Sequence, residues 1–153
     1  MSVDIYTGKA SLSDLEKIMK IENACFGADA FSRQQMAYLI SHAKGIFLVA
    51  KYDDKIAGYI SFITSKRHNT GRIYSVAVMP EYRNYGVGGK LLNKTIEYAI
   101  QKELNAIFLE VRTDNLTAIS IYEKKGFTKR FIKPNYYHDG ADGYSMVLEF
   151  VKD

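Results

Sequence analysis

The sequence predicts a single domain over residues 1–153 of the α/β (α+β) class, with a mixed central sheet of about seven strands and helices on both faces. Short apolar runs alternate with segments of helical spacing in the order β-α-α-β-β-β-α-β-α-β-β, which is typical of a sheet covered by helices. A length of 153 residues suits one domain with a sizeable core. The chain has no repeat, linker or low-complexity tract that would divide it.

The N-terminal half begins with a predicted strand over residues 3–9, followed by two helices. Residues 13–16 and 32–35 each show the capping-box pattern of a helix start, and apolar residues at helical spacing follow both. Three predicted strands come next, over residues 46–51, 56–64 and 72–79. The polar turn at residues 53–55 joins the first two of these strands as a hairpin.

The C-terminal half begins with a long predicted helix that starts near Leu91 and ends near Glu103, with an apolar stripe along one side. A strand over residues 105–112 follows, and then a short helix over residues 115–125. Gly126 closes that helix, because glycine adopts the left-handed conformation that a helix end requires. The last two predicted strands cover residues 127–132 and 143–151.

The segment between the strand at residues 72–79 and the long helix is rich in glycine. A strand, a glycine turn and a helix start form an anion cradle, because glycine lets backbone amides approach a phosphate and the helix dipole favours negative charge. The spacing fits neither a P-loop nor a dinucleotide fingerprint. The pattern R-x-x-G-x-G therefore predicts a diphosphate-bearing ligand, and a turn that binds nothing is the alternative. The segment consists of Arg83, Asn84, Tyr85, Gly86, Val87, Gly88, Gly89 and Lys90.

Glu110 is the anomaly in an otherwise apolar predicted strand. By two-residue alternation its side chain shares a face with Phe108 and Arg112. A carboxylate in a buried strand needs a partner, or its pKa rises. Glu110 is therefore a candidate general base. A structural ion pair with Arg112, or a position on a solvated face of the sheet, explains the residue equally well.

Asn115 and Tyr122 lie seven residues apart, close to two helical turns, and so share one face of the short predicted helix. Asn115 is a good N-cap, and its amide could also bind a ligand. Tyr122 offers a phenol that can donate a proton. Taken alone, a tyrosine on a helix is more often a core residue with a satisfied hydroxyl.

Two motifs together resemble the GNAT acyltransferase superfamily and, within it, the RimI-like protein N-terminal acetyltransferases. The first is the glycine segment with Val76-Ala77-Val78 before it. The second covers residues 109–127 and follows the pattern L-E-V-R-x-x-N-x-x-A-I-x-x-Y-E-x-x-G-F. Asn135-Tyr136-Tyr137, before the last hairpin, is a further point of likeness. The similarity covers nearly the whole chain and is weakest before Gly45.

The resemblance implies acetyl-CoA as the cofactor and a GNAT fold for the domain. It implies that the backbone of Val76, Ala77 and Val78 pairs with the pantetheine arm as a strand would. Residues 83–90 would hold the pyrophosphate, and Asn115 would also contact the cofactor.

The resemblance also implies direct transfer of the acetyl group, with no covalent enzyme intermediate. Glu110 would act as the base, through water, and Tyr122 would protonate the departing thiolate. Phe26, Tyr136 and Tyr137 would line the groove for the acceptor peptide.

Composition excludes several other classes of function. Lys and Arg outnumber Asp and Glu by 21 to 17, a net charge of +4 that is too small and too scattered to predict nucleic-acid binding. No apolar run predicts a membrane span, and the N-terminus lacks a signal-peptide pattern. The single cysteine, Cys25, fits a reducing cytoplasm, and the three histidines have no zinc-like spacing, so we expect no metal.

We therefore expect a cytoplasmic N-acetyltransferase that modifies the α-amino group of protein or peptide N-termini, as a monomer or homodimer. An α-amine with a pKa near about 7.7–8 needs only a weak base. The alternatives are a GNAT enzyme for a small amine (a polyamine or an antibiotic) or a lysine side chain, and a non-catalytic acyl-CoA-binding regulatory module. Residues 25–32 lack the prolines and the tryptophan common in the RimI-like group, so the acceptor preference stays open.

Overall fold

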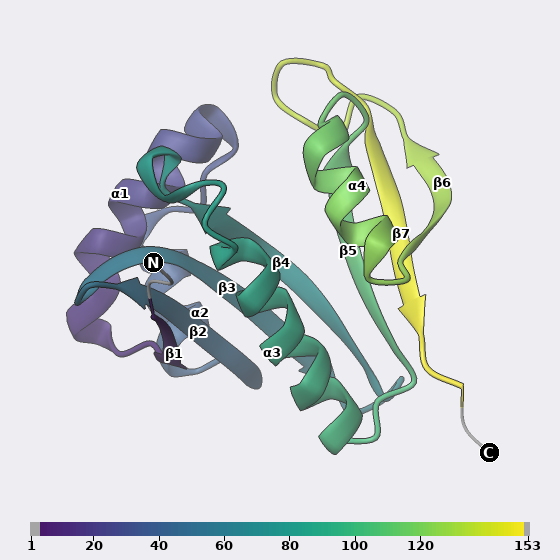
Figure 1. Cartoon of the computed structure of the whole chain (residues 1–153). Coiled ribbons are helices and arrows are strands. Elements are labelled where there is room, and N and C mark those ends of the chain that lie inside the picture. Colours follow the sequence, from purple (N-terminus) through teal and green to yellow (C-terminus); the bar gives the residue numbers. More distant parts are fainter. Residues whose placement is uncertain (1–3, 152–153) are drawn as a thin grey trace.

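The chain forms one mixed sheet of seven strands in the order β1-β2-β3-β4-β5-β7-β6 (Figure 1). This computed structural model describes residues 4–151, so the expected start of the first strand at Val3 lies outside the described residues. β4 and β5 are parallel, and all other neighbours are antiparallel. The strands are β1 (Ile5–Lys9), β2 (Gly45–Tyr52), β3 (Lys55–Ser65), β4 (Thr70–Val78), β5 (Ala106–Arg112), β6 (Thr128–Lys133) and β7 (Gly143–Glu149).

Within residues 4–151, four helices cover the two faces of the sheet, which confirms the predicted fold class. α1 (Leu15–Phe26) and α2 (Arg33–Ser41) pack on one face. α3 (Val87–Gln101) and α4 (Leu116–Lys124) pack on the other, in front of the sheet in Figure 1. Three short 3₁₀ turns complete the fold, at Leu12–Asp14, Gly27–Asp29 and Pro80–Tyr82.

Each face of the sheet has its own apolar core, because the helices are amphipathic and bury one stripe each. On the face of α3 and α4, fully buried side chains such as Leu91, Ile107 and Leu109 pack together. On the face of α1 and α2, a smaller core includes Ile18 and Met36. The two cores hold the strands between them as one rigid layer.

Of the two capping boxes predicted from the sequence, one is present and the other is not. Ser32 and Gln35 form the predicted capping box of α2, with backbone-to-side-chain bonds of 2.8 and 3.1 Å. The predicted box at residues 13–16 is wrong, because Asp14 instead accepts from the backbone N–H of Ser11 at 2.9 Å. The chain therefore enters a 3₁₀ turn two residues before the predicted cap.

The start of α3 differs from the prediction in a way that matters for ligand binding. The helix begins at Val87, four residues before Leu91, and Gly86 is its N-cap in the left-handed conformation at φ 80°. Gly88 and Gly89 thus lie in the first helical turn and not in a loop before it. The helix also ends at Gln101, before the expected Glu103.

The parallel strands β4 and β5 part soon after they begin. Their pairing is limited to Thr70 through Arg72 on β4, opposite Ala106 through Phe108 on β5. The register between β3 and β4 also shifts at this point, so that Tyr74 is an extra, unpaired residue. Such a bulge bends a strand and increases its local twist. From residue 73 onward, the strands diverge and leave an opening in the middle of the sheet (Figure 1).

Candidate active site

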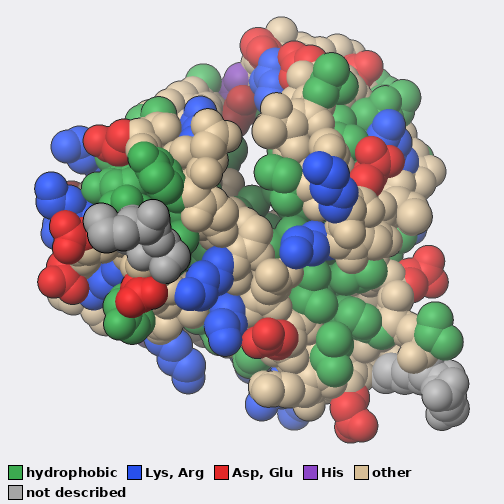
Figure 2. All heavy atoms as spheres, viewed as in Figure 1, with side chains coloured by type: hydrophobic (Ala, Val, Ile, Leu, Met, Phe, Trp, Pro, Cys, Tyr) green, Lys and Arg blue, Asp and Glu red, His purple; other side chains and the backbone are tan. Residues whose placement is uncertain are grey.

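A pocket of about 680 Å³ occupies the opening between β4 and β5. Figure 2 shows the molecule hollowed between its two halves, with Lys and Arg side chains below the hollow on both sides. The pocket brings together the predicted residues of both strands, of α4 and of the acceptor groove. Seven of these line it: Phe26, Val76, Glu110, Asn115, Tyr122, Tyr136 and Tyr137.

Glu110 projects into this pocket from β5, and its side chain is 10% exposed. Its Oε2 accepts from Nη1 of Arg72 on β4 and, at 3.1 Å, from Nζ of Lys133 on β6. Oε1 has no hydrogen bond within residues 4–151. The sequence-based ion pair with Arg112 is wrong, because Glu110 and Arg112 bind different partners. Glu110 is both an ion-paired residue and a residue of the pocket wall.

The two cations set the protonation state of Glu110. Burial by itself raises the pKa of this carboxyl, but hydrogen bonds and attraction from Arg72 and Lys133 outweigh burial and hold the pKa below its ordinary value. Glu110 is therefore ionised at neutral pH. It presents one uncommitted oxygen as a hydrogen-bond acceptor.

Tyr122 lines the same pocket, from α4. Its ring packs against Phe127, with the ring centroids 5.7 Å apart. Burial raises the pKa of Tyr122 to about 12, so the phenol is protonated at neutral pH. Within the described residues its hydroxyl has no hydrogen-bond partner. This hydroxyl is a proton or hydrogen-bond donor available to a ligand.

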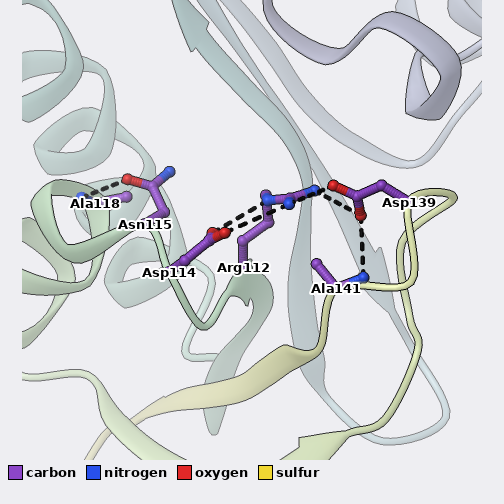
Figure 3. Close-up of polar contacts among 6 residues, drawn as sticks. All are labelled: Arg112, Asp114, Asn115, Ala118, Asp139 and Ala141. Atoms are coloured by element: carbon purple, nitrogen blue, oxygen red, sulfur yellow. Dashed lines mark hydrogen bonds and ion pairs between the residues drawn. The ribbon is translucent and has the colours of Figure 1, made fainter.

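Asn115 is the N-cap of α4, as predicted, and its Oδ1 accepts from the backbone N–H of Ala118 at 3.2 Å (Figure 3). The capping bond uses the side-chain oxygen and leaves the amide NH₂ as a donor toward the pocket that Asn115 lines. In the same view Arg112 lies between Asp114 and Asp139, with its closest contact at 2.6 Å to Asp139. That ion pair joins the end of β5 to the loop before β7.

The first turn of α3 offers backbone amides that no residue of the helix itself can use. Gly86 has no side chain to cap them. A Cβ at Gly89 would meet no atom within 4 Å, so a bulky ligand has room there. Val87 contributes only its backbone, since its side chain is 2% exposed in the core. Tyr85 is half exposed, and its ring lies 5.3 Å from that of Tyr52.

The side chains of the two cations within residues 83–90 contact other groups of the protein. Arg83 donates from Nε to the carbonyl of Val78 at 3.2 Å, and its Nη2 lies 3.6 Å from Sγ of Cys25. Lys90 donates from Nζ to the carbonyl of Ile5 on β1. The contacts with Cys25 and Ile5 could not be predicted from the sequence spacing, because both join residues that are distant in the chain.

The remaining edge of β4 completes the cofactor side of the site. Val76, Ala77 and Val78 pair with β3 on one side. On their other side no strand follows, because the pairing with β5 ends at Arg72. Alternate backbone groups of an extended strand point to each side, so this edge can bond an extended ligand, except at the Val78 carbonyl, which already accepts from Nε of Arg83.

The acceptor side is built by two segments that meet across the pocket. Tyr136 and Tyr137 pack edge to face, with centroids 5.0 Å apart, and Phe26 is 36% exposed on α1. Asp29 accepts from the backbone N–H of His138 at 2.9 Å. Burial raises the pKa of both tyrosines, so these rings are neutral walls.

Residues 15–127 match the model of the Acetyltransferase (GNAT) family. The chain belongs to the GNAT family of acetyltransferases. It is 32% identical over 153 residues to the N-alpha-acetyltransferase of Sulfurisphaera tokodaii, covering 90% of this chain and 89% of that protein. It is 33% identical to an uncharacterized protein of Mycobacterium leprae over 95% of this chain, and spans 41% of that protein's length. The structure of the Escherichia coli ribosomal-protein-S18-alanine N-acetyltransferase superposes with a TM-score of 0.87 at 25% identity, covering 98% of this chain and 96% of that one.

As a GNAT protein the chain is an N-acetyltransferase that uses acetyl-CoA, as the sequence resemblance implies. The observed site fits this group. An uncapped helix start with open space at Gly89 suits a diphosphate, and the free edge of β4 suits an extended arm with amide groups. Within residues 4–151 no three His, Cys, Asp or Glu side chains are arranged to hold a metal ion. No helix in the same range has the length and apolar character of a membrane span.

A buried polar cluster that was not predicted from the sequence lines part of the pocket. Glu22 on α1 is 1% exposed and accepts from the hydroxyls of Tyr59 and, at 2.7 Å, Ser75. It also accepts from the backbone N–H of Phe31 at 3.0 Å. The signal was a glutamate at helical spacing on the apolar face with Leu15, where a charge requires buried partners. The roles of Arg72 and Lys133 were not predicted either, because their pairing with Glu110 depends on strand register.

Proposed function

We propose that this GNAT enzyme transfers the acetyl group of acetyl-CoA directly to the α-amino group of protein or peptide N-termini. The observation that carries the proposal is one pocket lined by both an ionised carboxylate, that of Glu110, and a protonated phenol, that of Tyr122. The relative named N-alpha-acetyltransferase and the Escherichia coli enzyme for a ribosomal protein support this class of acceptor.

Glu110 receives the proton that the amine must lose. The acceptor enters as a neutral amine, and as its nitrogen bonds to the acyl carbon the N–H becomes strongly acidic. A base with a lowered pKa suffices for that proton, and a water molecule bound at the free Oε1 of Glu110 relays it. Arg72 and Lys133 fix the carboxylate so that this oxygen points to the reaction and needs no reorganisation.

Tyr122 stabilises the departing sulfur as the carbon–sulfur bond breaks. Acetyl-CoA supplies an activated thioester. A thiol has a pKa near about 8.5, well below the value of about 12 for Tyr122. The phenol therefore keeps its proton and stabilises the thiolate as a hydrogen-bond donor, and the thiolate takes its proton from solvent. This refines the proton-donor role that the resemblance implies.

The cofactor is held by residues with no part in these proton movements. The amides of Gly88 and Gly89 bind the pyrophosphate, together with the rest of residues 83–90. The backbone of residues 76–78 bonds the pantetheine arm, and the Asn115 amide contributes a further bond. Arg83 reaches the pyrophosphate only by leaving the Val78 carbonyl, to which it donates at 3.2 Å. Phe26, Tyr136 and Tyr137 bind the first residues of the acceptor.

We further propose that residues 1–153 act as one catalytic domain in the cytoplasm, as a monomer or homodimer. One continuous sheet supports the single domain, and the free thiol of Cys25 supports a reducing compartment. Light scattering on the purified chain tests the oligomeric state, and a tetramer or larger assembly would contradict it. Fractionation of cells that produce the chain tests the compartment.

A small-amine acceptor is the main rival, and the charges of the pocket argue against it. Its acidic groups are already engaged: Glu110 by two cations, Asp29 by a backbone amide and Glu22 by three donors. A polyamine would approach Arg72 and Lys133 with like charge. The test is release of free CoA with a panel of peptides, free lysine, spermidine and aminoglycosides. We expect faster turnover with the peptides than with any of the other amines. Faster turnover of a small amine would refute the proposal. Tight CoA binding without turnover of any amine would identify a regulatory module.

A further inference from the structure

Among residues 4–151, one face of the β5–β7–β6 part of the sheet carries a line of cations and rings that lies outside both helix-packed cores. On the other face of these strands, Leu109, Val111 and Met146 belong to the core with α3 and α4. On the pocket side, α1 and α2 cover β2 to β4, and Phe108 and Phe131 belong to neither core. Phe131 is 48% exposed.

Arg130 lies between these two rings. Its Cζ is 4.9 Å from the ring centroid of Phe108 and 5.0 Å from that of Phe131. The register of β6 against β7 skips Arg130, so the strand has a bulge there, and a bulge redirects a side chain. Arg72 lies 5.9 Å over the Phe108 ring, and Lys133 lies on the same edge strand as Arg130. We call Arg72, Phe108, Arg130, Phe131 and Lys133 the cation–ring strip.

The strip has an excess of positive charge. Arg72 and Lys133 share one carboxylate, that of Glu110. Arg130 has no carboxylate partner among residues 4–151. Three cations therefore face a single anion. A guanidinium that contacts two rings is ordered in advance, so it loses little freedom when a carboxylate binds to it.

The strip is continuous with the pocket, since Arg72 and Lys133 belong to both. Glu110 pairs with Ser145 on β7, which pairs with Phe131 on β6, so the strip runs across two strand spacings from the reaction centre. Two spacings are about 10 Å, or roughly three residues of extended chain. A polypeptide whose α-amine reaches Glu110 would place its residues from about the fourth onward over Arg130.

On the basis of the proposed function, we infer that the cation–ring strip binds acidic residues of the acceptor polypeptide, downstream of the residues held in the pocket. A carboxylate near the fourth to sixth position forms a bidentate bond with Arg130, and its neighbours pack on Phe131. The enzyme therefore selects N-termini followed by an acidic stretch. The strip offers one unpaired arginine beside a peptide pocket and not a broad basic surface, which favours an acidic peptide over a nucleic acid.

The test uses two fluorescent peptides with the same first three residues and either aspartates or lysines at the fourth to sixth positions. Binding to the CoA-loaded full-length chain is measured by anisotropy, and turnover as kcat/KM. Wild type should prefer the acidic peptide by about ten-fold or more, with the preference weakening as salt rises. Arg130→Gln should lose most of this preference, and Arg130→Glu should favour the lysine peptide.

Lys129→Gln is the matched control, because Lys129 is the neighbouring cation but lies over Tyr144 at 4.6 Å and outside the strip. It should keep the wild-type preference. The inference is overturned if Arg130→Gln keeps that preference, if Lys129→Gln loses as much, or if an RNA hexamer binds more tightly than the acidic peptide. Failure of wild type to acetylate any peptide would refute the proposed function, while the anisotropy measurement would still decide the strip.

Discussion

Replacing Glu22 with glutamine tests the polar cluster that holds β4 where it parts from β5. Glu22 binds the hydroxyls of Tyr59 and Ser75 through Oε1 and the backbone N–H of Phe31 through Oε2. Glutamine keeps an oxygen for the two hydroxyls but turns an NH₂ group toward the N–H of Phe31. A hydrogen bond to a charged group contributes about 1.5–3 kcal/mol. Since a neutral amide is cheaper to bury than a carboxylate, we expect a net loss of about 2 kcal/mol of unfolding free energy.

Glu22→Ala should cost more, because it removes every acceptor. The hydroxyls of Tyr59 and Ser75 lie 3.3 Å apart and can bond each other, but the N–H of Phe31 and one hydroxyl proton lose their partner. Two unsatisfied donors at about 1–3 kcal/mol each, with about 0.8 kcal/mol for each lost CH₂, give a loss of about 4 kcal/mol or more.

Urea unfolding at equilibrium measures both losses, provided that the m-value does not change. The glutamine variant should also melt about 4–8 °C lower, from the scaling for a domain of this size. Glu16→Gln is the matched control, since Glu16 pairs with Arg33 on the exposed surface and a surface pair contributes about 1 kcal/mol or less. If Glu22→Gln is as stable as this control, the hydrogen bonds of Glu22 do not stabilise the fold.

Three further predictions concern the site. Tyr122→Phe should lower kcat by about 10²-fold or more and leave the Kd for CoA unchanged. In wild type, ionisation of Tyr122 should not lower kcat until the pH nears the Tyr122 pKa of about 12. A fall of kcat at lower alkaline pH that is absent from the variant would contradict this. Lys133→Met should raise the pKa of Glu110, because one of the cations that lower this pKa is gone. Since the ionised carboxylate is the active form, kcat of the variant, relative to its value at about pH 8, should fall more steeply than that of wild type between about pH 6 and pH 4. Identical pH profiles would show that Lys133 does not lower the pKa of Glu110. Gly89→Asp should weaken CoA binding, measured by calorimetry, by about ten-fold or more, because the new carboxylate occupies the first turn of α3. The free energy of unfolding should stay equal or rise by about 0.3–1 kcal/mol. An unchanged affinity for CoA would show that the pyrophosphate binds elsewhere.

The sequence predicted the sheet, because alternation and helical spacing are local properties of β5, α4 and their neighbours. It also singled out Glu110, since a carboxylate among Leu109 and Val111 stands out in one strand. It could not identify the partners of Glu110, because Arg72 and Lys133 reach it only through the pairing of β4 with β5 and of β6 with β7. The ion pair expected between Glu110 and Arg112, which is nearer in sequence, is wrong for that reason.

Other errors have equally local causes. The pattern at residues 13–16 matched a capping box, but Ser11 and Asp14 made the actual one, because two overlapping serines offered the same chemistry. The sequence predicts a loop where the first turn of α3 lies, because glycine has low helix propensity. The positions of Arg83 and Lys90 depend on contacts with Val78 and Ile5, which no spacing rule reports.

The most direct test of the account uses one unblocked peptide that contains both a free α-amine and an internal lysine. The chain is incubated with this peptide and acetyl-CoA, and tandem mass spectrometry locates the acetyl group. The account predicts acetylation of the α-amine, a far smaller signal on the lysine, and loss of the α-amine product in Glu110→Gln. Acetyl on the lysine with the α-amine unmodified would contradict it.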